Sequence, residues 1–257
     1  MPLTSKSPSP SPNKDPQRHF PFILIVGNRK GGSGKTFLTM HLAWQAVENG
    51  LSVLVIDTDV QGDSYRRLLA RPEMKIRPPA KFAPKGWVVW TPDEYTLPEF
   101  PSLWDYDLIL IDAPPSGTGL PRGPWVMNLV APVDGIDAAR NAVELAEEAL
   151  TQGRVGTAIL VLNKLDEGGP DHAEAIRQIE NHLPPGAVLH PRAILHAPCI
   201  KRAEWTGRPA WEDADQDDAA VRSLVAFCDT YVCEAMRWRD WATMENIAST
   251  VHGARHG

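Results

Sequence analysis

The chain has 257 residues, of which 43% are hydrophobic and 23% charged, and a formal net charge of −6. This composition is ordinary for a globular protein with one large domain, and it excludes a globally basic nucleic-acid binder. No apolar run approaches the roughly 20 residues that a membrane-spanning helix needs. The three cysteines form no Cys-x-x-Cys pair, which indicates a reducing, cytoplasmic compartment rather than a disulfide framework or a zinc site.

The N-terminal segment, residues 1–19, is rich in proline and serine and contains no hydrophobic stretch. It therefore lacks the apolar core of a secretory signal, and we expect a disordered leader. An inert leader is a simpler expectation than a partner-binding peptide. We expect the folded domain over residues 20–240 and a C-terminal tail over residues 241–257.

Six short apolar runs predict β-strands, over residues 22–27, 52–57, 107–112, 127–133, 157–162 and 187–190. Several runs are too uniformly apolar for a half-exposed antiparallel strand, and this favours parallel strands that are covered on both faces. Residues 71–101 are rich in proline, and we expect an added strand within them around residues 87–90.

Helical patterns lie between several of these runs. Residues 36–48 carry an apolar stripe and end at an Asn-Gly pair, which is a helix stop signal. Further helices are predicted over residues 136–151 and 172–182, and one or two more over residues 214–250. Strands that alternate with helices predict right-handed crossovers, and hence an α/β fold with a doubly wound, mostly parallel sheet.

A glycine-rich loop, residues 28–34, joins the first predicted strand to the first predicted helix. Its glycines allow close approach, so that successive backbone N–H groups and the helix N-terminus can bind phosphate oxygens. Lys35 would then reach the β- and γ-phosphates, and Thr36 would offer its hydroxyl to Mg²⁺. The expected nucleotide contacts in this segment are Gly31, Gly32, Ser33, Gly34, Lys35, Thr36 and Phe37.

Carboxylates follow two further strands, where Asp57 and Asp59 end the second run and Asp112 ends the third. Each aspartate taken alone could cap a helix or a turn. Beside a phosphate loop, however, such carboxylates can hold Mg²⁺ and orient an attacking water molecule. Together with the loop they predict a P-loop nucleotide site at the carboxyl ends of the strands.

Three stretches in this order resemble the ParA/MinD family of deviant Walker A ATPases. KGGSGKT is similar to the motif K-G-G-x-G-K-[ST], VLVIDTDVQGD to the second acidic motif, and LILIDAPPS to the Walker B strand. The resemblance runs from about residue 22 to residue 235. It accounts for Arg29, which stands where the common phosphate loop has glycine, because Lys30 marks this branch. Val60, where proline is common, and the Gly- and Pro-rich stretch after Asp112 depart from the pattern.

The resemblance implies an ATP hydrolase with the cofactors ATP and Mg²⁺. Lys30 would cross an ATP-bound homodimer and touch the partner's phosphates, as an arginine finger does. Lys35 would bind the phosphates of its own subunit, and Asp59 would position the hydrolytic water. The implied ligands or neighbours of the metal are Thr36, Asp57 and Asp112.

The segment Asn163-Lys164-Leu165-Asp166 matches the motif N-K-x-D, with which GTPases recognise guanine. ParA-like proteins carry an asparagine at the same strand end that contacts adenine, and Asn163 matches it. Lys30 belongs to the adenine-using branch, so we expect ATP, with GTP as the alternative.

The resemblance also implies DNA contacts near the C-terminus, where residues 190–212 match a basic helix followed by a glycine turn. The expected contacts are Lys201, Arg202, Arg208, Arg222, Arg237 and Arg239. They would bind phosphates without sequence preference. Acidic residues outnumber basic ones over residues 190–257, so an ordinary solvated face is the alternative.

The function implied is that of a nucleoid-associated partitioning or positioning ATPase, stimulated by a ParB-like or other adaptor protein. Its cargo would be a plasmid, a chromosome region or a protein assembly. One alternative is a small-molecule ATP-dependent enzyme of the same fold, and another is an iron–sulfur carrier, which normally has a paired-cysteine motif. A third is MinD-like membrane association through Trp238, Trp241, Met244 and Ile247, for which packing onto the core or a dimer partner is the simpler expectation.

Overall fold

The computed structural model describes residues 20–69, 86–90, 106–115, 127–165, 169–213 and 218–253. The expected leader, Asp166 of the N-K-x-D segment, and the Gly- and Pro-rich stretch over residues 116–126 lie outside the described residues.

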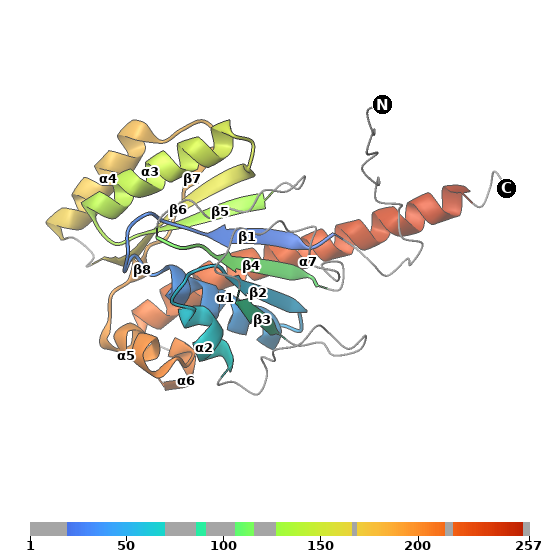
Figure 1. Ribbon diagram of the computed structural model, residues 1–257, viewed down its shortest axis with the longest axis horizontal. Coiled ribbons are helices and arrows are strands. Elements are labelled where there is room, and N and C mark those ends of the chain that lie inside the picture. Colours follow the sequence, from blue (N-terminus) through green and yellow to red (C-terminus); the bar gives the residue numbers. More distant parts are fainter. Residues whose placement is uncertain are drawn as a thin grey trace, which may run out of the picture.

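A parallel sheet forms the centre of the protein (Figure 1). Its strands are β1 (Phe22–Val26), β2 (Val53–Asp57), β3 (Trp87–Trp90), β4 (Leu108–Asp112), β5 (Met127–Val133), β6 (Val155–Leu165), β7 (Ala187–Leu189) and the short β8 (Ile194–Leu195). The spatial order is β3-β2-β4-β1-β5-β6-β7, with β8 beside β6, and each of these pairs is parallel. The predicted doubly wound α/β fold is confirmed, and the added strand around residues 87–90 is present as β3.

Helices cover both faces of the sheet (Figure 1). In β1, Ile23 and Ile25 join a core with α3 (Ile136–Thr151) and α4 (Pro170–His182). Leu24 and Val26 point the other way and join a second core with α1 (Lys35–Glu48) and α7 (Ala219–Gly253). This alternation is the strand period of two, and burial on both faces explains why the strand runs are apolar throughout.

Three short helices lie on the α1 side of the sheet and were not all foreseen. They are α2 (Asp63–Leu69), α5 (Pro198–Thr206) and α6 (Ala210–Asp213). Helix α5 begins with proline and ends at Gly207, whose φ of 63° places it in the left-handed region. Both features are typical of helix ends, since proline lacks an N–H that the first turn would leave unpaired and glycine adopts positive φ without strain. The basic helix before a glycine turn is therefore present.

Helix α7 has 35 residues, and its C-terminal part extends away from the body of the molecule (Figure 1). Its first half is anchored by side chains such as Phe227, which is fully buried against the second core. Further along, Trp238 donates an indole hydrogen bond to the carbonyl oxygen of Phe20 at 2.7 Å, and its ring lies 5.3 Å from that of Trp241. The helix continues without a break past residue 240, where we expected the folded domain to end, and it ends at Gly253. The side chains of Met244 and Ile247 lie outside the described part.

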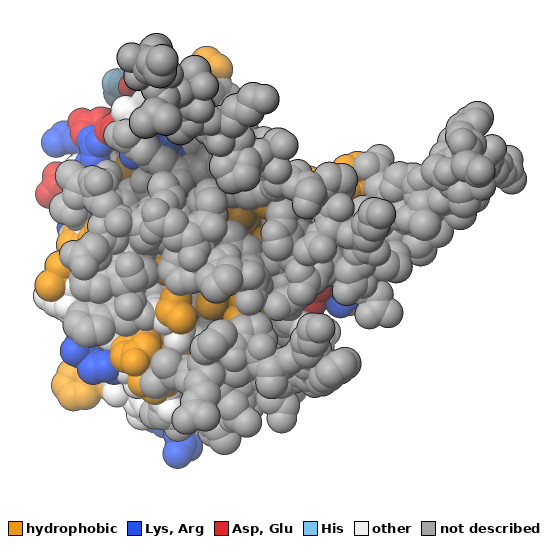
Figure 2. Space-filling view, turned by 45° about the vertical axis from the view of Figure 1, so that its right-hand side comes forward, with side chains coloured by type: hydrophobic (Ala, Val, Ile, Leu, Met, Phe, Trp, Pro, Cys, Tyr) orange, Lys and Arg blue, Asp and Glu red, His pale blue; other side chains and the backbone are white. Residues whose placement is uncertain are grey.

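On the face shown in Figure 2, the described hydrophobic side chains lie in several small areas, some of them beside Lys and Arg side chains. Within the described ranges, none of the helices is long and apolar enough to cross a membrane.

Candidate functional site

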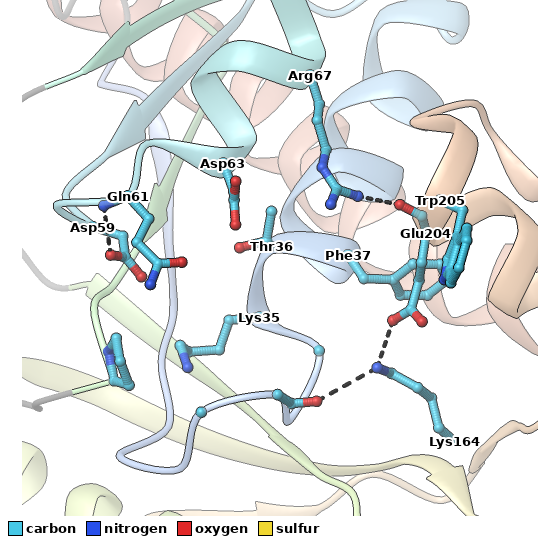
Figure 3. A pocket seen from close by; sticks show the side chains of 14 residues that line it. Lys35, Thr36, Phe37, Asp59, Gln61, Asp63, Arg67, Lys164, Glu204 and Trp205 are labelled. Atoms are coloured by element: carbon cyan, nitrogen blue, oxygen red, sulfur yellow. Dashed lines mark hydrogen bonds and ion pairs between the residues drawn. The ribbon is translucent and has the colours of Figure 1, made fainter.

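The carboxyl ends of β1, β2 and β4 meet at one edge of the sheet. The register pairs Asp112 with Val26 on one side and with Asp57 on the other, so the two aspartates become neighbours. A cavity of about 700 Å³ opens above them. It is lined by the β1–α1 loop, the start of α1, the β2–α2 loop, Lys164 and the end of α5 (Figure 3). The predicted phosphate loop, Asp57, Asp59 and Asp112 thus come together at this edge of the sheet.

The loop between β1 and α1 is held in a shape that only glycine fits at one position. Gly34 has a φ of 98°, and a Cβ atom added to it would lie 2.1 Å from the side-chain nitrogen of Asn163. That nitrogen donates a hydrogen bond to the carbonyl oxygen of Ser33 at 2.8 Å. Gly31 and Gly32 are exposed at the loop tip. The loop therefore presents backbone to the cavity while Asn163 supports it from below.

Asn28 is a second support of the loop, and it was missed in the sequence. It is 1% exposed, and its side-chain nitrogen donates to the carbonyl oxygens of Pro132 at 2.7 Å and Ala138 at 3.1 Å. Its side-chain oxygen accepts the backbone N–H of Lys30 at 2.9 Å. The available signal in the sequence was an asparagine that directly follows the apolar run of residues 22–27.

Lys35 lines the cavity and is 7% exposed. Its ammonium group donates to the carbonyl oxygen of Lys30 at 3.0 Å. Burial lowers the pKa of this lysine, while the charges of Asp112, Asp59 and Asp134 act in the opposite direction. A partly desolvated cation with few bonds of its own is well suited to bind an anion.

Asp112 lies under the cavity and is 1% exposed. Burial, and then repulsion from Asp57, raise its pKa to about 7. Neither oxygen of its carboxylate has a hydrogen-bond partner among the described residues, although the Thr36 and Ser64 hydroxyls are close enough to favour the ionised form. A buried acceptor pair without a donor is unfavourable, and a ligand that supplies positive charge would satisfy it.

Asp57 differs from Asp112 because its carboxylate is already occupied. One oxygen accepts the N–H of Asp59 at 3.0 Å and the other accepts the N–H of Tyr65 at 2.9 Å. Burial raises the pKa of Asp57 as well, and these two hydrogen bonds oppose the rise. Asp57 thus shapes the loop that carries Asp59 and adds negative charge beside Asp112.

The residues present fit a magnesium ion, as the unpaired oxygens of Asp112 show. The Asp112 carboxylate and the Thr36 hydroxyl would hold it, with Asp57 contributing through water or through its charge. No group of three or more His, Cys, Asp or Glu side chains among the described residues could hold a metal alone. Mg²⁺ commonly relies on substrate phosphates for its remaining ligands, and it would neutralise their charge when bound.

Asp59 lies at the same end of the cavity as Gln61 (Figure 3). One of its carboxylate oxygens accepts the N–H of Gln61 at 2.9 Å. Between them, Val60 points outward and is 72% exposed. The loop therefore presents the Asp59 carboxylate to the cavity, and its role in orienting water stays a prediction.

Lys30 lies beside the cavity without lining it. Its ammonium group pairs with Asp134, at 3.1 Å, and the two side chains are 35% and 21% exposed. The neighbouring Arg29 is held on α3 by Glu148 and, at 3.6 Å, by Glu144. Asp134 was missed in the sequence, although it follows the end of β5 in the same way as the other strand-end aspartates.

The other end of the cavity is built from segments outside the three motifs that carry the family resemblance. The ammonium group of Lys164 lies 2.5 Å from a carboxylate oxygen of Glu204 and 3.5 Å from the carbonyl oxygen of Gly32. Arg67 donates to the backbone carbonyl of Glu204, and Trp205 completes this end (Figure 3). Asn163 is fully buried under the loop and does not itself line the cavity, so its contact with a base stays a prediction.

The six expected DNA contacts do not form one patch. Lys201 and Arg202 are exposed on α5, Arg208 follows in the next turn, and Arg222 lies near the start of α7. Arg237 and Arg239 are further along α7, about 22 Å from Arg222 at 1.5 Å per helical residue. They form ion pairs with Glu234, at 2.9 Å, and Asp240, at 3.2 Å.

The profile of the CobQ/CobB/MinD/ParA nucleotide binding domain matches residues 24–210 of this chain. Protein IncC of Escherichia coli is 54% identical over 47 residues, which cover 18% of this chain and 13% of IncC. Cell division protein PomZ of Myxococcus xanthus is 28% identical over 79% of this chain and 75% of its own length. Chromosome-partitioning ATPase Soj of Thermus thermophilus is 29% identical over 44% of this chain, and the match spans only 52% of Soj.

Among solved structures, MinD in the MinC:MinD complex of Aquifex aeolicus has a similar fold. The TM-score is 0.60 at 18% identity, covering 82% of this chain and 95% of the other. The family profile extends from β1 into α6, over the β1–α1 loop and both acidic strand ends. The chain therefore belongs to the CobQ/CobB/MinD/ParA family, as a P-loop ATPase of the ParA/MinD type.

Proposed function

We propose that this ATPase works as a dimeric switch that positions or partitions a cargo. ATP binds in the 700 Å³ cavity, and two subunits then join with their cavities facing each other. Lys30 of each subunit contacts the nucleotide of the other, and the dimer binds DNA through phosphate contacts. Hydrolysis, stimulated by an adaptor protein, returns the subunits to monomers. The names of PomZ, a cell division protein, and Soj, a chromosome-partitioning ATPase, support this class of function.

The placement of Lys30 carries the proposal. Lys35 already supplies a cation inside the cavity, whereas Lys30 lies outside it with its ammonium group partly exposed. Its only ion pair among the described residues is with Asp134, whose side chain is also partly exposed. Such a pair is worth about 1 kcal/mol or less, so a more highly charged phosphate can replace Asp134 at small cost.

Asp59 would act on the water that attacks the γ-phosphate. It is the cavity carboxylate nearest in sequence to the buried Asp57, and it is carried by a loop that Asp57 fixes. A carboxylate in this place orients water and accepts its proton as the new bond forms. Lys35 and Lys30 would offset the negative charge of the transferring phosphoryl group from two sides.

DNA binding would come from the basic residues of α5 and the turn after it. Lys201 and Arg202 are exposed there, close in sequence to the Glu204 and Trp205 that line the cavity. Two weak basic surfaces joined in one dimer gain avidity that a monomer lacks, so ATP would control DNA binding through dimerisation. Nucleoid association and the response to a ParB-like adaptor belong to the same proposal.

The proposal is tested with Lys30→Ala and with Arg177→Ala as the control. Arg177 is an exposed cation on α4 that pairs with Glu174. Light scattering and a DNA titration at fixed salt would be measured with a slowly hydrolysed ATP analogue. We expect Lys30→Ala to bind nucleotide as a monomer but to lose analogue-induced dimerisation and most DNA binding, while Arg177→Ala behaves as wild type. A Lys30→Ala protein that still dimerises and binds DNA normally would exclude the cross-subunit role.

A further inference from the structure

Trp205 is exposed to an unusual degree for a side chain that lines a cavity. It is 84% exposed, the highest value among the large hydrophobic side chains in the described part of the chain. It nevertheless belongs to the lining of the same cavity as Lys35 and Thr36. An indole in water leaves a large apolar surface unpaired, and tryptophans in such positions are typical of binding sites.

The cavity has two chemically different ends (Figure 3). The glycine loop, Lys35 and Thr36 provide backbone N–H groups, a cation and a hydroxyl at one end. Trp205 at the other end provides a flat aromatic face. A nucleotide has the same polarity, with an anionic phosphate chain at one end and a flat aromatic base at the other.

The helix that carries Trp205 is tied to the phosphate loop. Its neighbour Glu204 pairs with Lys164, whose ammonium group also lies 3.5 Å from the carbonyl oxygen of Gly32. Arg67 donates to the backbone carbonyl of Glu204 from the side of α2. The end of α5 is thus held from two directions, which fixes where the indole stands relative to the loop.

We propose that Trp205 stacks on the base of the bound nucleotide and closes the outer end of the cavity. This inference rests on the proposed function, since it takes the cavity as the ATP site. Every base has an aromatic face, so stacking supplies affinity without choosing between adenine and guanine. Trp205 would therefore strengthen nucleotide binding, while the choice of base is made elsewhere.

A second copy of the chain is the other possible occupant of this surface. The base is favoured because Trp205 shares its cavity with the phosphate-binding residues of its own subunit. A base stacked on Trp205 affects the affinity of a monomer for ADP, whereas a contact between copies affects only dimerisation. The two occupants are therefore separated by measuring ADP binding to the monomer.

The experiment is calorimetric titration of the full chain with Mg-ADP, Mg-GDP and inorganic tripolyphosphate. Four proteins are compared with wild type: Trp205→Ala, Trp205→Phe, Lys35→Ala and Trp241→Ala. Trp241 is a matched control, because it is 50% exposed on α7 and is not among the residues that line the cavity. We expect Trp205→Ala to weaken ADP and GDP alike by about tenfold and to leave tripolyphosphate binding unchanged. Trp205→Phe should retain most of the affinity, Trp241→Ala all of it, and Lys35→Ala should lose all three ligands.

Three results would overturn the inference. If Trp205→Ala binds ADP as tightly as wild type, stacking is excluded. If Trp205→Ala loses only the dimerisation induced by a slowly hydrolysed ATP analogue, Trp205 belongs to the interface between copies. An equal loss of ADP and tripolyphosphate would show that Trp205 only supports the fold of the site. If wild type binds neither ADP nor tripolyphosphate, the proposed function itself fails, and this is distinct from a failure of Trp205 alone.

Discussion

The two ends of the nucleotide cavity are built in different ways. At the phosphate end, the loop, Asp57 and Asp112 lie at the ends of neighbouring strands of the sheet and are fixed by strand register and by partly buried hydrogen bonds. At the outer end, Lys164 from β6 and Glu204 from α5 form an ion pair between partly buried side chains, and the exposed Trp205 follows Glu204 in α5. The first end depends on strand register within the sheet, whereas the second depends on side-chain contacts between segments far apart in the chain, so we expect mutations at the two ends to have different consequences.

The largest effect is expected at the phosphate end, for Asp59→Ala. Because Asp59 lines the cavity but is not part of the buried core, its loss should leave folding, ATP binding and dimerisation intact. Steady-state hydrolysis should fall by about 100-fold or more, the usual contribution of a positioned base.

Asp63→Ala is the matched control for Asp59, since Asp63 lines the same cavity and pairs with Arg66 at 2.8 Å. It should retain most of the turnover, measured as phosphate release under saturating ATP. An Asp59→Ala protein that hydrolyses ATP at the wild-type rate would show that the water is oriented by another group.

His41 joins α1, which carries Lys35 and Thr36, to α6, and it should make this connection sensitive to pH. It is fully buried on α1, where its Nε2 accepts the N–H of Ala210 at 3.1 Å and its Nδ1–H donates to the carbonyl oxygen of Phe37 at 2.8 Å. Burial lowers its pKa from 6.5 to about 4. The folded state thus resists protonation, and the associated stability is complete above pH 6.5 and is lost as the pH falls toward 4.

The loss amounts to about 3 kcal/mol of unfolding free energy between these two pH values. The measurement is urea unfolding of wild type and His41→Gln between pH 7 and pH 4. The unfolding free energy of the variant should be lower at pH 7 and should fall less steeply with acid. Parallel pH profiles for the two proteins would mean that His41 does not titrate in this range.

A smaller effect on stability is expected at Gly34, where the phosphate loop contacts Asn163. Gly34→Ala places a methyl group 2.1 Å from the Asn163 side chain at a φ of 98°. The left-handed conformation alone costs a non-glycine residue about 1–2 kcal/mol, and the loop must shift in addition. Gly31→Ala is the control, because no atom lies within 4 Å of its Cβ position. Thermal unfolding should show a lower midpoint for Gly34→Ala alone, and equal midpoints would contradict the close contact.

The phosphate end of the cavity could be predicted from the sequence, and the outer end could not. The glycine loop, Asp57, Asp59 and Asp112 were identified because each follows an apolar run that is continuous in the chain, and parallel strands bring such ends together. The strands, α1, α3 and α4 were predicted for the same local reason. The burial of β2 and β4 on both faces also follows from their apolar sequence.

The outer end could not be predicted because its contacts join segments far apart in the chain. Lys164 and Glu204 are 40 positions apart, and nothing local to either residue indicates their pairing. The short elements α2, α6 and β8 are too brief to show a periodic pattern. Asp134 was within reach of the strand-end argument, but its pairing with Lys30 depends on the β5–α3 loop lying beside the phosphate loop. Trp205 was predicted only to lie on a basic helix, and not to line the cavity.

The central claim is that Lys30 of one subunit serves the ATP of the other, and complementation tests it most directly. Lys30→Ala and Asp59→Ala should each be inactive alone, because Lys30→Ala does not form the ATP-bound homodimer and the Asp59→Ala homodimer lacks the carboxylate at both sites. In a mixed dimer, the Lys30→Ala subunit keeps its own Asp59 and receives Lys30 from its partner, so one of the two sites is complete. An equal mixture should therefore recover ATPase activity, up to about a quarter of the wild-type rate, which is the share of complete sites when subunits pair at random in a two-fold symmetric dimer. A mixture as inactive as its two components would contradict the account.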